Sequence, residues 1–187
     1  QRDWLRGQTL QDQFAYWKAR LADVPVLALP TDRPRPSGHS FRGTHVFLDL
    51  PLPLLNGLKQ LSTQAGATLY MVFLAGFVTL LHRLTGQQDI AVGTPIANRG
   101  WLAIEGLIGT FVNTLVLRAD VSGEPTFRTL LSRVRDTALD AFAHQDLPFE
   151  KLVEELRPDR SHGGPPLVQV LFNFANTPFG RVDFKHL

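Results

Sequence analysis

Apolar residues recur at helical spacing along several stretches of the chain. In the first of them Leu10, Phe14 and Trp17 share one helical face, and Thr9 is the expected N-cap. A later stretch, Leu69 to Leu81, is apolar almost all round, which predicts a helix buried on most of its faces. Helices are predicted over residues 8–22, 53–64, 68–85, 126–143 and 149–156.

Shorter runs between these helices have the alternating or continuously apolar pattern of strands. Strands are predicted over residues 41–50, 89–94, 110–121 and 168–174, and a loop rich in Gly, Pro and Asn over residues 95–109. Prolines crowd residues 25–38, which excludes a helix there and indicates an extended connector. Helices that alternate with strands predict an α/β fold, with helices packed on a mixed β-sheet.

Composition places the chain among globular proteins. It has 187 residues, of which 44% are hydrophobic and 19% charged, enough for one domain with a core and unlike a disordered chain. The absence of cysteine excludes disulfides, thiolate nucleophiles and cysteine-type zinc sites, and it fits a cytoplasmic location. The longest apolar run is too short to cross a membrane, so no membrane partner is expected. Basic residues are scattered and the net charge is +2, so no nucleic-acid partner is expected either.

No catalytic constellation is visible in the sequence. The six histidines show no pair at helical i, i+3 or i, i+4 spacing, so no metal site is expected. Phosphate-binding glycine motifs and the GxSxG nucleophile motif are absent, and the sequence leaves a cofactor-binding site unknown.

Three segments are nevertheless unusual for ordinary packing. The first is DIAVGTPIANR (residues 89–99), a predicted strand that leads into a loop containing Asn98 and Arg99. The second is LIGTFVNTLVLR (residues 107–118), in which Asn113 lies inside an apolar strand. A buried amide needs hydrogen-bond partners, and we expect those of Asn113 among residues 95–109. The third segment, HQDLPFE, brings polar residues to a helix end. Its simplest interpretation is a histidine near a helix C-terminus, followed by Asp146 as the cap of the next helix.

Taken together, these segments resemble the condensation domains of nonribosomal peptide synthetases. The resemblance rests on FAYWKARL, LPTDRPRP, GTPIANR, IGTFVNT, HQDLPFEKLVEEL and PDRS, in that order, and runs from about residue 1 to residue 176. Two departures stand out. Arg160 is followed by SHGGPPL where the family has a run like SRNPL, and the HHxxxDG motif with the family's catalytic histidine is absent.

The resemblance implies a chloramphenicol-acetyltransferase-like fold, of which residues 1–187 would be the truncated C-terminal lobe, with its proline-rich connector at about 25–38. Such domains form the amide bond between aminoacyl or peptidyl thioesters that carrier proteins hold on phosphopantetheine. The expected partners are therefore the N-terminal lobe, donor and acceptor carrier proteins and an adjacent adenylation domain. The lobe itself would bind no cofactor. A bacterial origin and a role in antibiotic biosynthesis are also implied.

The resemblance also implies roles for individual residues. No catalytic residue is expected within this chain, because the catalytic histidine would lie before Gln1. Tunnel-lining or structural roles are expected for Asn98, Arg99, Asn113, His144, Gln145, Asp146 and Arg160. Arg160 is expected to anchor the loop before the last strand, or alternatively to reach the tunnel.

Two other functions remain open. One is a condensation-like module without catalytic activity that recruits a partner protein, and the other is a stand-alone acyltransferase with a soluble acceptor. The intact IGTFVNT and HQDLPFE motifs favour a peptide-bond-forming member over epimerising or cyclising relatives.

Overall fold

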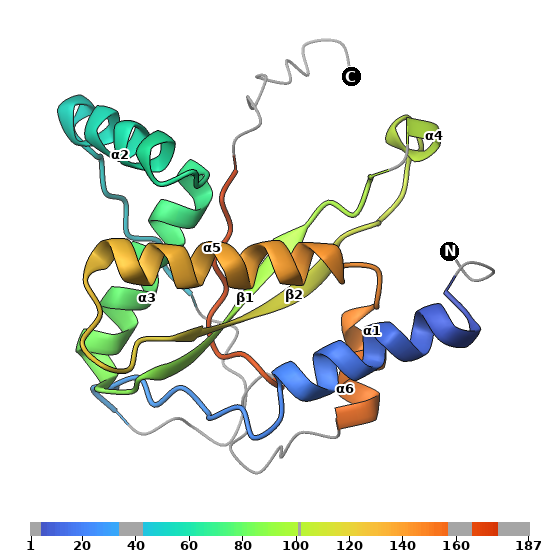
Figure 1. Ribbon diagram of the computed structural model, residues 1–187. Coiled ribbons are helices and arrows are strands. Elements are labelled where there is room, and N and C mark those ends of the chain that lie inside the picture. The colour runs from blue at the N-terminus through green and yellow to red at the C-terminus, as the bar shows by residue number, and fades with distance from the viewer. Residues whose placement is uncertain (1–4, 34–42, 101, 157–165, 176–187) are drawn as a thin grey trace.

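The computed structural model describes residues 5–33, 43–100, 102–156 and 166–175. Its helices and strands are α1 (Gly7–Arg20), α2 (Leu52–Gln64), α3 (Leu69–Thr85), β1 (Asp89–Ile96), α4 (Leu102–Glu105), β2 (Asn113–Asp120), α5 (Phe127–Ala143) and α6 (Phe149–Leu156) (Figure 1). This confirms the predicted α/β class and all five predicted helices. The short helix α4 lies where the sequence predicted only a loop.

β1 and β2 pair antiparallel, from Asp89 opposite Asp120 to Ile96 opposite Asn113. Residues 166–175 run along the other edge of β1. There Gly93 donates its N–H to the carbonyl of Val170 at 3.0 Å, and its own carbonyl accepts from Phe172 at 2.8 Å. The predicted strand over 168–174 is wrong in extent, because only one parallel bridge forms within the described residues, between Gly93 and Leu171. Pro95 has no N–H to donate, so this pairing does not continue from Gly93 toward the end of β1.

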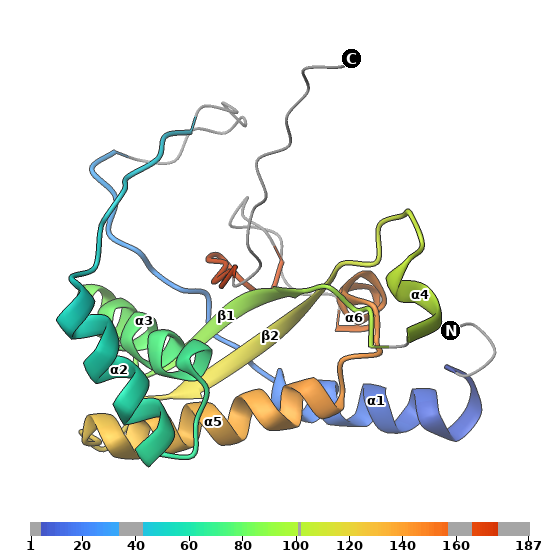
Figure 2. The same ribbon diagram turned by 90° about the horizontal axis from the view of Figure 1, so that it is seen from above.

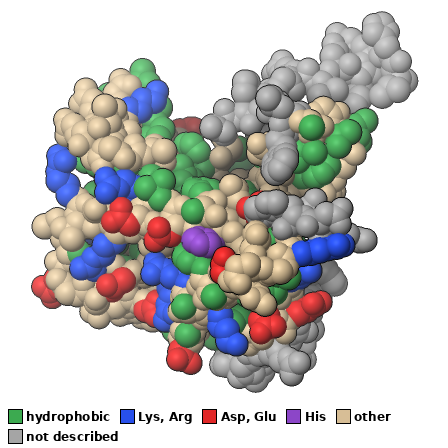
Figure 3. All heavy atoms as spheres, turned by 45° about the vertical axis from the view of Figure 1, so that its right-hand side comes forward, with side chains coloured by type: hydrophobic (Ala, Val, Ile, Leu, Met, Phe, Trp, Pro, Cys, Tyr) green, Lys and Arg blue, Asp and Glu red, His purple; other side chains and the backbone are tan. Residues whose placement is uncertain are grey.

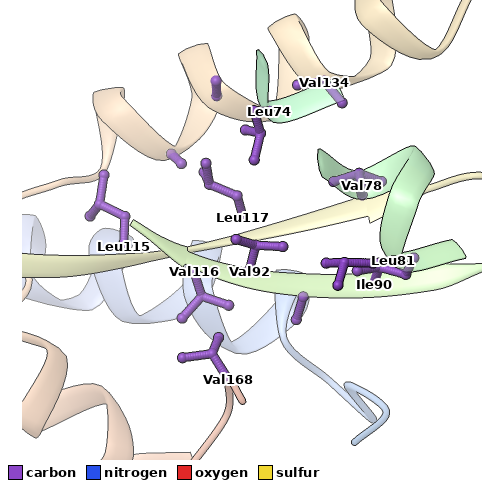
Figure 4. Packing of buried hydrophobic residues seen from close by; sticks show 14 of the residues in the cluster. Leu74, Val78, Leu81, Ile90, Val92, Leu115, Val116, Leu117, Val134 and Val168 are labelled. Atoms are coloured by element: carbon purple, nitrogen blue, oxygen red, sulfur yellow. The ribbon is translucent and has the colours of Figure 1, made fainter. Parts of the chain in front are cut away.

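The core lies between the sheet and the helices α3 and α5. Leu115 and Leu117 of β2 point toward these helices, whereas Val116 faces Val168 on the opposite side (Figure 4). All four side chains are buried, as is Leu74 of α3. Full burial of one such side chain stabilises a fold by about 1.5–3 kcal/mol, so these layers hold both strands in place.

Side-chain and glycine caps fix the ends of the two core helices. Thr68 accepts a hydrogen bond from the amide of Met71 at 3.2 Å, and α3 ends at Gly86 in the left-handed conformation, with a φ of 73°. Thr126 caps α5 in the same way, accepting from the amide of Thr129 at 3.2 Å. Thr9, in contrast, lies inside α1, so its predicted capping role is wrong.

Residues 43–50 form no strand, contrary to the sequence prediction. They leave the body of the molecule as an extended segment that leads into α2 (Figure 2). The alternation of apolar residues is present, but neither strand of the described sheet pairs with this segment. An isolated strand has no partner for its backbone groups and is not stable in water.

In the part of the chain that the structure describes, no single helix is long and apolar enough to cross a membrane. Helices α2 and α3 are long and apolar enough only when they are taken together, and the chain bends by 107° between them.

Candidate functional site

Asn113 joins the start of β2 to the turn between α5 and α6. Its Nδ2 donates to the carbonyls of Gln145 at 3.0 Å and Leu147 at 2.9 Å. Its Oδ1 accepts from the amide of Phe149 at 3.0 Å and from its own neighbour Thr114 at 2.9 Å. The side chain is buried, as the sequence predicted, and its amide makes four hydrogen bonds.

The partners of Asn113 differ from the prediction. They were expected among residues 95–109, whereas the structure places three of them within residues 145–149. The reason is geometric. The side chain reaches the turn that enters α6. Since the amide of Phe149 is the first N–H of α6, Asn113 satisfies a group that the helix itself leaves unbonded.

Two aromatic residues of α1 also contact this turn. The indole Nε1 of Trp17 donates to the carbonyl of His144 at 2.9 Å, and Trp17 is buried. The ring of Tyr16 stacks on the imidazole of His144, with centroids 3.7 Å apart and planes 4° from parallel. Nδ1 of His144 lies 2.8 Å from the carbonyl of Asp140, one turn earlier in α5. The imidazole is therefore fixed by a stacking contact and a backbone contact.

The turn formed by residues 144–149, called the HQDLPF turn below, is thus bound at four backbone positions. The carbonyls of residues 144, 145 and 147 and the amide of residue 149 all meet side chains from α1 or β2. Helices α1, α4 and α6 lie at the same end of the molecule in both ribbon views (Figures 1 and 2). The two motifs that the sequence singled out as strand and turn are therefore one hydrogen-bonded unit.

Arg99 organises the segment that precedes β2. Its Nη1 donates to the carbonyls of Ile104 at 2.7 Å and Leu107 at 2.8 Å, and its Nη2 donates to Gly109 at 3.0 Å. The guanidinium also lies over the ring of Phe111, 4.3 Å from its centroid. The residue before it, Asn98, has a φ of 51° and turns the chain.

The segment held by Arg99 presents apolar side chains to solvent. Leu107, Ile108 and Val112 are exposed, and hydrophobic side chains reach the surface around α4, at the upper right of Figure 3. Hydrogen bonds to three carbonyls hold this surface in one conformation, although it lacks strand pairing.

Asp146 lies in the middle of the turn, and burial raises the pKa of its carboxyl group. A carboxylate that accepts backbone N–H bonds at a helix start has its pKa lowered instead. At the start of α6 it is Asn113 that accepts the first amide. The capping role of Asp146 stays a prediction. Arg160 lies outside the described residues, and its role also stays a prediction.

An ion pair that the sequence analysis missed supports the opposite end of the two strands. Arg118 of β2 binds the carboxylate of Asp89 with both Nε and Nη2, the shortest contact being 2.6 Å. The hydrogen bond with Asp89 raises the pKa of Arg118. Asp89 begins one predicted strand and Arg118 lies near the end of the next. Opposite charges at such positions are a cross-strand signal that could have revealed the pair.

Two of the motif residues, Arg99 and Asn113, bind the backbone around them through their side chains. They donate to carbonyls and accept from amides, so the arrangement can hold loops in fixed positions at one end of the sheet. Across the described residues, no group of three His, Cys, Asp or Glu side chains could hold a metal ion.

Comparison with known proteins identifies the family. A family model described as the condensation domain matches residues 1–185. The chain belongs to the condensation-domain family. It is 54% identical to a linear gramicidin synthase of Brevibacillus parabrevis, over all of this chain and 2% of that protein. It is 48% identical to the phosphinothricin tripeptide synthetase PhsB of Streptomyces viridochromogenes, covering 94% of this chain and 15% of that protein.

Solved structures agree with the condensation-domain fold. The X-domain from teicoplanin biosynthesis is 32% identical with a TM-score of 0.84, and the match covers 89% of this chain and 37% of that one. The four-domain nonribosomal peptide synthetase holo-AB3403 gives a TM-score of 0.87 at 27% identity, over 91% of this chain and 13% of that one. The resemblance and the fold class drawn from the sequence are both confirmed.

Proposed function

We propose that this chain forms one lobe of a condensation domain that makes peptide bonds in a nonribosomal peptide synthetase. The observation that carries the proposal is the set of hydrogen bonds from Asn113 to the HQDLPF turn, because it joins two family motifs into one framework. The 54% identity to a gramicidin synthase supports the same activity.

In the proposed reaction the amine of a carrier-bound acceptor attacks the thioester carbonyl of a carrier-bound donor. A C–N bond forms, the C–S bond breaks, and the donor carrier's phosphopantetheine leaves as a thiol after the amine has lost a proton. Because both substrates are tethered to carrier proteins, most of the rate enhancement is expected to come from positioning them against each other. The base that orients or deprotonates the amine would be the histidine of HHxxxDG, a motif that this sequence does not contain.

The role of this lobe is then to form one wall of the tunnel and to share in docking the carrier proteins. An adjacent adenylation domain and a cytoplasmic location belong to the same proposal. Support for the multidomain setting comes from the four-domain synthetase that shares this fold. The hydrogen bonds that hold the HQDLPF turn and the segment before β2 suit a wall that must keep its shape.

A second function has support from one comparison. The X-domain, 32% identical over 87% of this chain, forms a complex with OxyB in teicoplanin biosynthesis. A condensation-like lobe can therefore belong to a module that recruits another protein. The higher identity to the gramicidin synthase favours peptide-bond formation here.

The test uses the complete condensation domain with loaded donor and acceptor carrier proteins, and mass spectrometry detects the dipeptidyl carrier product. We expect product from the complete domain and none above background from residues 1–187 alone. Product from the short chain would show that the catalytic group lies within it. No product from the complete domain, together with binding of a partner protein, would favour the recruiting module.

A further inference from the structure

The segment before α2 exposes an unusual run of apolar side chains. Every residue from Gly43 to Leu54 is exposed, and Val46, Phe47 and Leu48 have 91%, 90% and 84% of their surface in contact with solvent. Leu52, in the first turn of α2, is also 66% exposed. Contiguous apolar surface of this kind marks an interaction site.

The sequence of the segment has the pattern of a strand. Val46, Leu48 and Leu50 alternate with His45 and Asp49, so the two sets would lie on opposite faces. Phe47 adds an apolar side chain to the second face, and its ring stacks on that of His45. The Val46 face is therefore entirely apolar, whereas Phe47 is one apolar side chain between His45 and Asp49, as in a strand with one covered face and one more polar face.

Neither edge of the described sheet takes up this strand. On β1 the outer edge at Gly93 is bonded to residues 170 and 172. On β2 the outward carbonyl of Arg118 accepts from the guanidinium of Arg20 at 2.8 Å. The backbone groups and the apolar faces of residues 44–50 therefore need a partner from outside the described part of this chain.

We propose that residues 44–50 form a strand that pairs with a sheet in the part of the condensation domain outside this chain. The chain spans 37% of the X-domain chain whose fold it shares, so more than half of such a domain lies outside the matched region. Permanent interfaces are more apolar than transient ones. Three adjacent apolar side chains, each with more than four fifths of its surface exposed, therefore fit a surface that is permanently buried in the complete domain. A strand of the same polypeptide therefore fits better than a carrier protein that binds and leaves.

This proposal rests on membership of the condensation-domain family and not on the peptide-bond-forming activity. It is tested by hydrogen exchange on the complete domain, read at the amides of residues 44–50. We expect exchange at least tenfold slower than in unstructured peptide, because strand pairing protects backbone N–H groups. Unprotected amides in the folded domain would overturn the proposal.

Cross-linking identifies the partner. A photo-reactive phenylalanine analogue in place of Asp49, in the complete domain, is expected to cross-link to residues of the same polypeptide outside residues 1–187. Cross-links to a second copy of the protein or to an added carrier protein would overturn the proposal.

Substitutions test which face is covered. Val46→Asp is expected to lower the thermal unfolding midpoint of the complete domain by several degrees. His45→Asp, the adjacent position on the other face, introduces the same charge and is expected to shift the midpoint less. Equal and small shifts for both variants would contradict burial of the Val46 face. If Val46→Asp does not fold, Val46→Thr, which keeps the branched shape, replaces it in the same comparison.

Discussion

Arg20 and Arg118 each donate a hydrogen bond to the backbone carbonyl of the other. Nη2 of Arg20 lies 2.8 Å from the carbonyl of Arg118, and Nη1 of Arg118 lies 3.0 Å from the carbonyl of Arg20. Arg20 also donates to the hydroxyl of Thr137 on α5, at 2.7 Å. This exchange fixes the end of α1 on β2. Since Trp17 lies one turn earlier on α1, it also fixes the helix that holds the HQDLPF turn.

A double-mutant cycle measures the coupling between these two arginines. Arg118→Ala is expected to lower the free energy of unfolding by about 1.5–3 kcal/mol, the range for hydrogen bonds that involve a charged group. Each of the substitutions Arg20→Ala and Arg118→Ala leaves in place the backbone carbonyl that accepts from the other arginine, so the two losses should differ from additivity, by about 0.5–3 kcal/mol, only through the shared contact of α1 with β2. Urea unfolding of the complete domain provides the measurement. Arg83→Ala, at an exposed position of α3, is the control and should change stability by less than about 0.5 kcal/mol.

Asn113 is the residue whose loss should loosen the turn most. Asn113→Ala leaves the carbonyls of Gln145 and Leu147 and the amide of Phe149 without this partner, and we expect a loss of about 2–4 kcal/mol. Asn113→Asp should cost at least as much at neutral pH, because a carboxylate cannot donate to the two carbonyls.

The same urea titration applies, with Asn56→Ala as the control. Asn56 is exposed on α2, where alanine is the better helix former, so the control should be neutral or slightly stabilising. If Asn113→Ala were as stable as the control, the hydrogen bonds of Asn113 would not determine the position of the turn.

The sequence predicted the helices and the positions of β1 and β2 well because these elements depend on local patterns. Thr68, Gly86 and Thr126 end or begin helices through contacts within a few residues, and such signals can be recognised along the chain. The strand predicted over 41–50 has an equally clear local pattern, but a strand forms only against a partner. Local alternation cannot show that the partner is missing from the described sheet.

The site could be predicted only in part for a related reason. The burial of Asn113 followed from its apolar neighbours, whereas its partners at residues 145–149 depend on how α6 enters beside β2. The pair formed by Arg20 and Arg118 is 98 residues apart in the sequence, and only the packing of α1 brings it together. Contacts of this kind are set by topology, which residue spacing along the chain does not contain.

Gly93 leaves room for the segment that runs beside β1. A Cβ atom at this position would lie 2.5 Å from Cδ2 of Leu171 and 3.0 Å from Cγ2 of Val168. The tip of Leu171 can move, because that side chain is 63% exposed, but Val168 is buried and stiff. We expect Gly93→Ala to cost somewhat less than Gly93→Val, for which overpacking should cost about 1–3 kcal/mol.

Gly57→Ala is the matched control for Gly93. Gly57 lies in α2, and a Cβ there meets no atom within 4 Å. Alanine should therefore stabilise the helix by up to about 1 kcal/mol. Thermal unfolding of the complete domain should rank Gly57→Ala above the unsubstituted protein, followed by Gly93→Ala and Gly93→Val. A neutral Gly93→Val would mean that residues 168–171 do not pack against β1.

Asp146 should make the folded domain less stable as the pH rises. Burial raises the pKa of its carboxyl, so the folded state holds this proton more tightly than the unfolded chain, whose value is about 3.9. Stability is then highest while the group is protonated, and it falls as the pH rises from the unfolded value through the raised folded value. Asp146→Asn removes this dependence. The variant should be more stable than the unsubstituted domain at pH 7, and the difference should shrink as the pH falls below about 4.

Urea unfolding of the complete domain between about pH 3.5 and 7 separates the effect of burying Asp146 from helix capping. The range begins near the ordinary carboxyl pKa of about 3.9. If Asp146 were the cap of α6, Asp146→Ala would lose about 0.5–2 kcal/mol relative to Asp146→Asn, since asparagine caps as well as aspartate does. Burial alone predicts similar stabilities for the two variants. Asp12→Asn, at an exposed site on α1, changes the net charge equally and should show no such gain at pH 7. A loss of stability in Asp146→Asn at pH 7 would show that the carboxylate is favourable in the fold, because its interactions would then outweigh the cost of its burial.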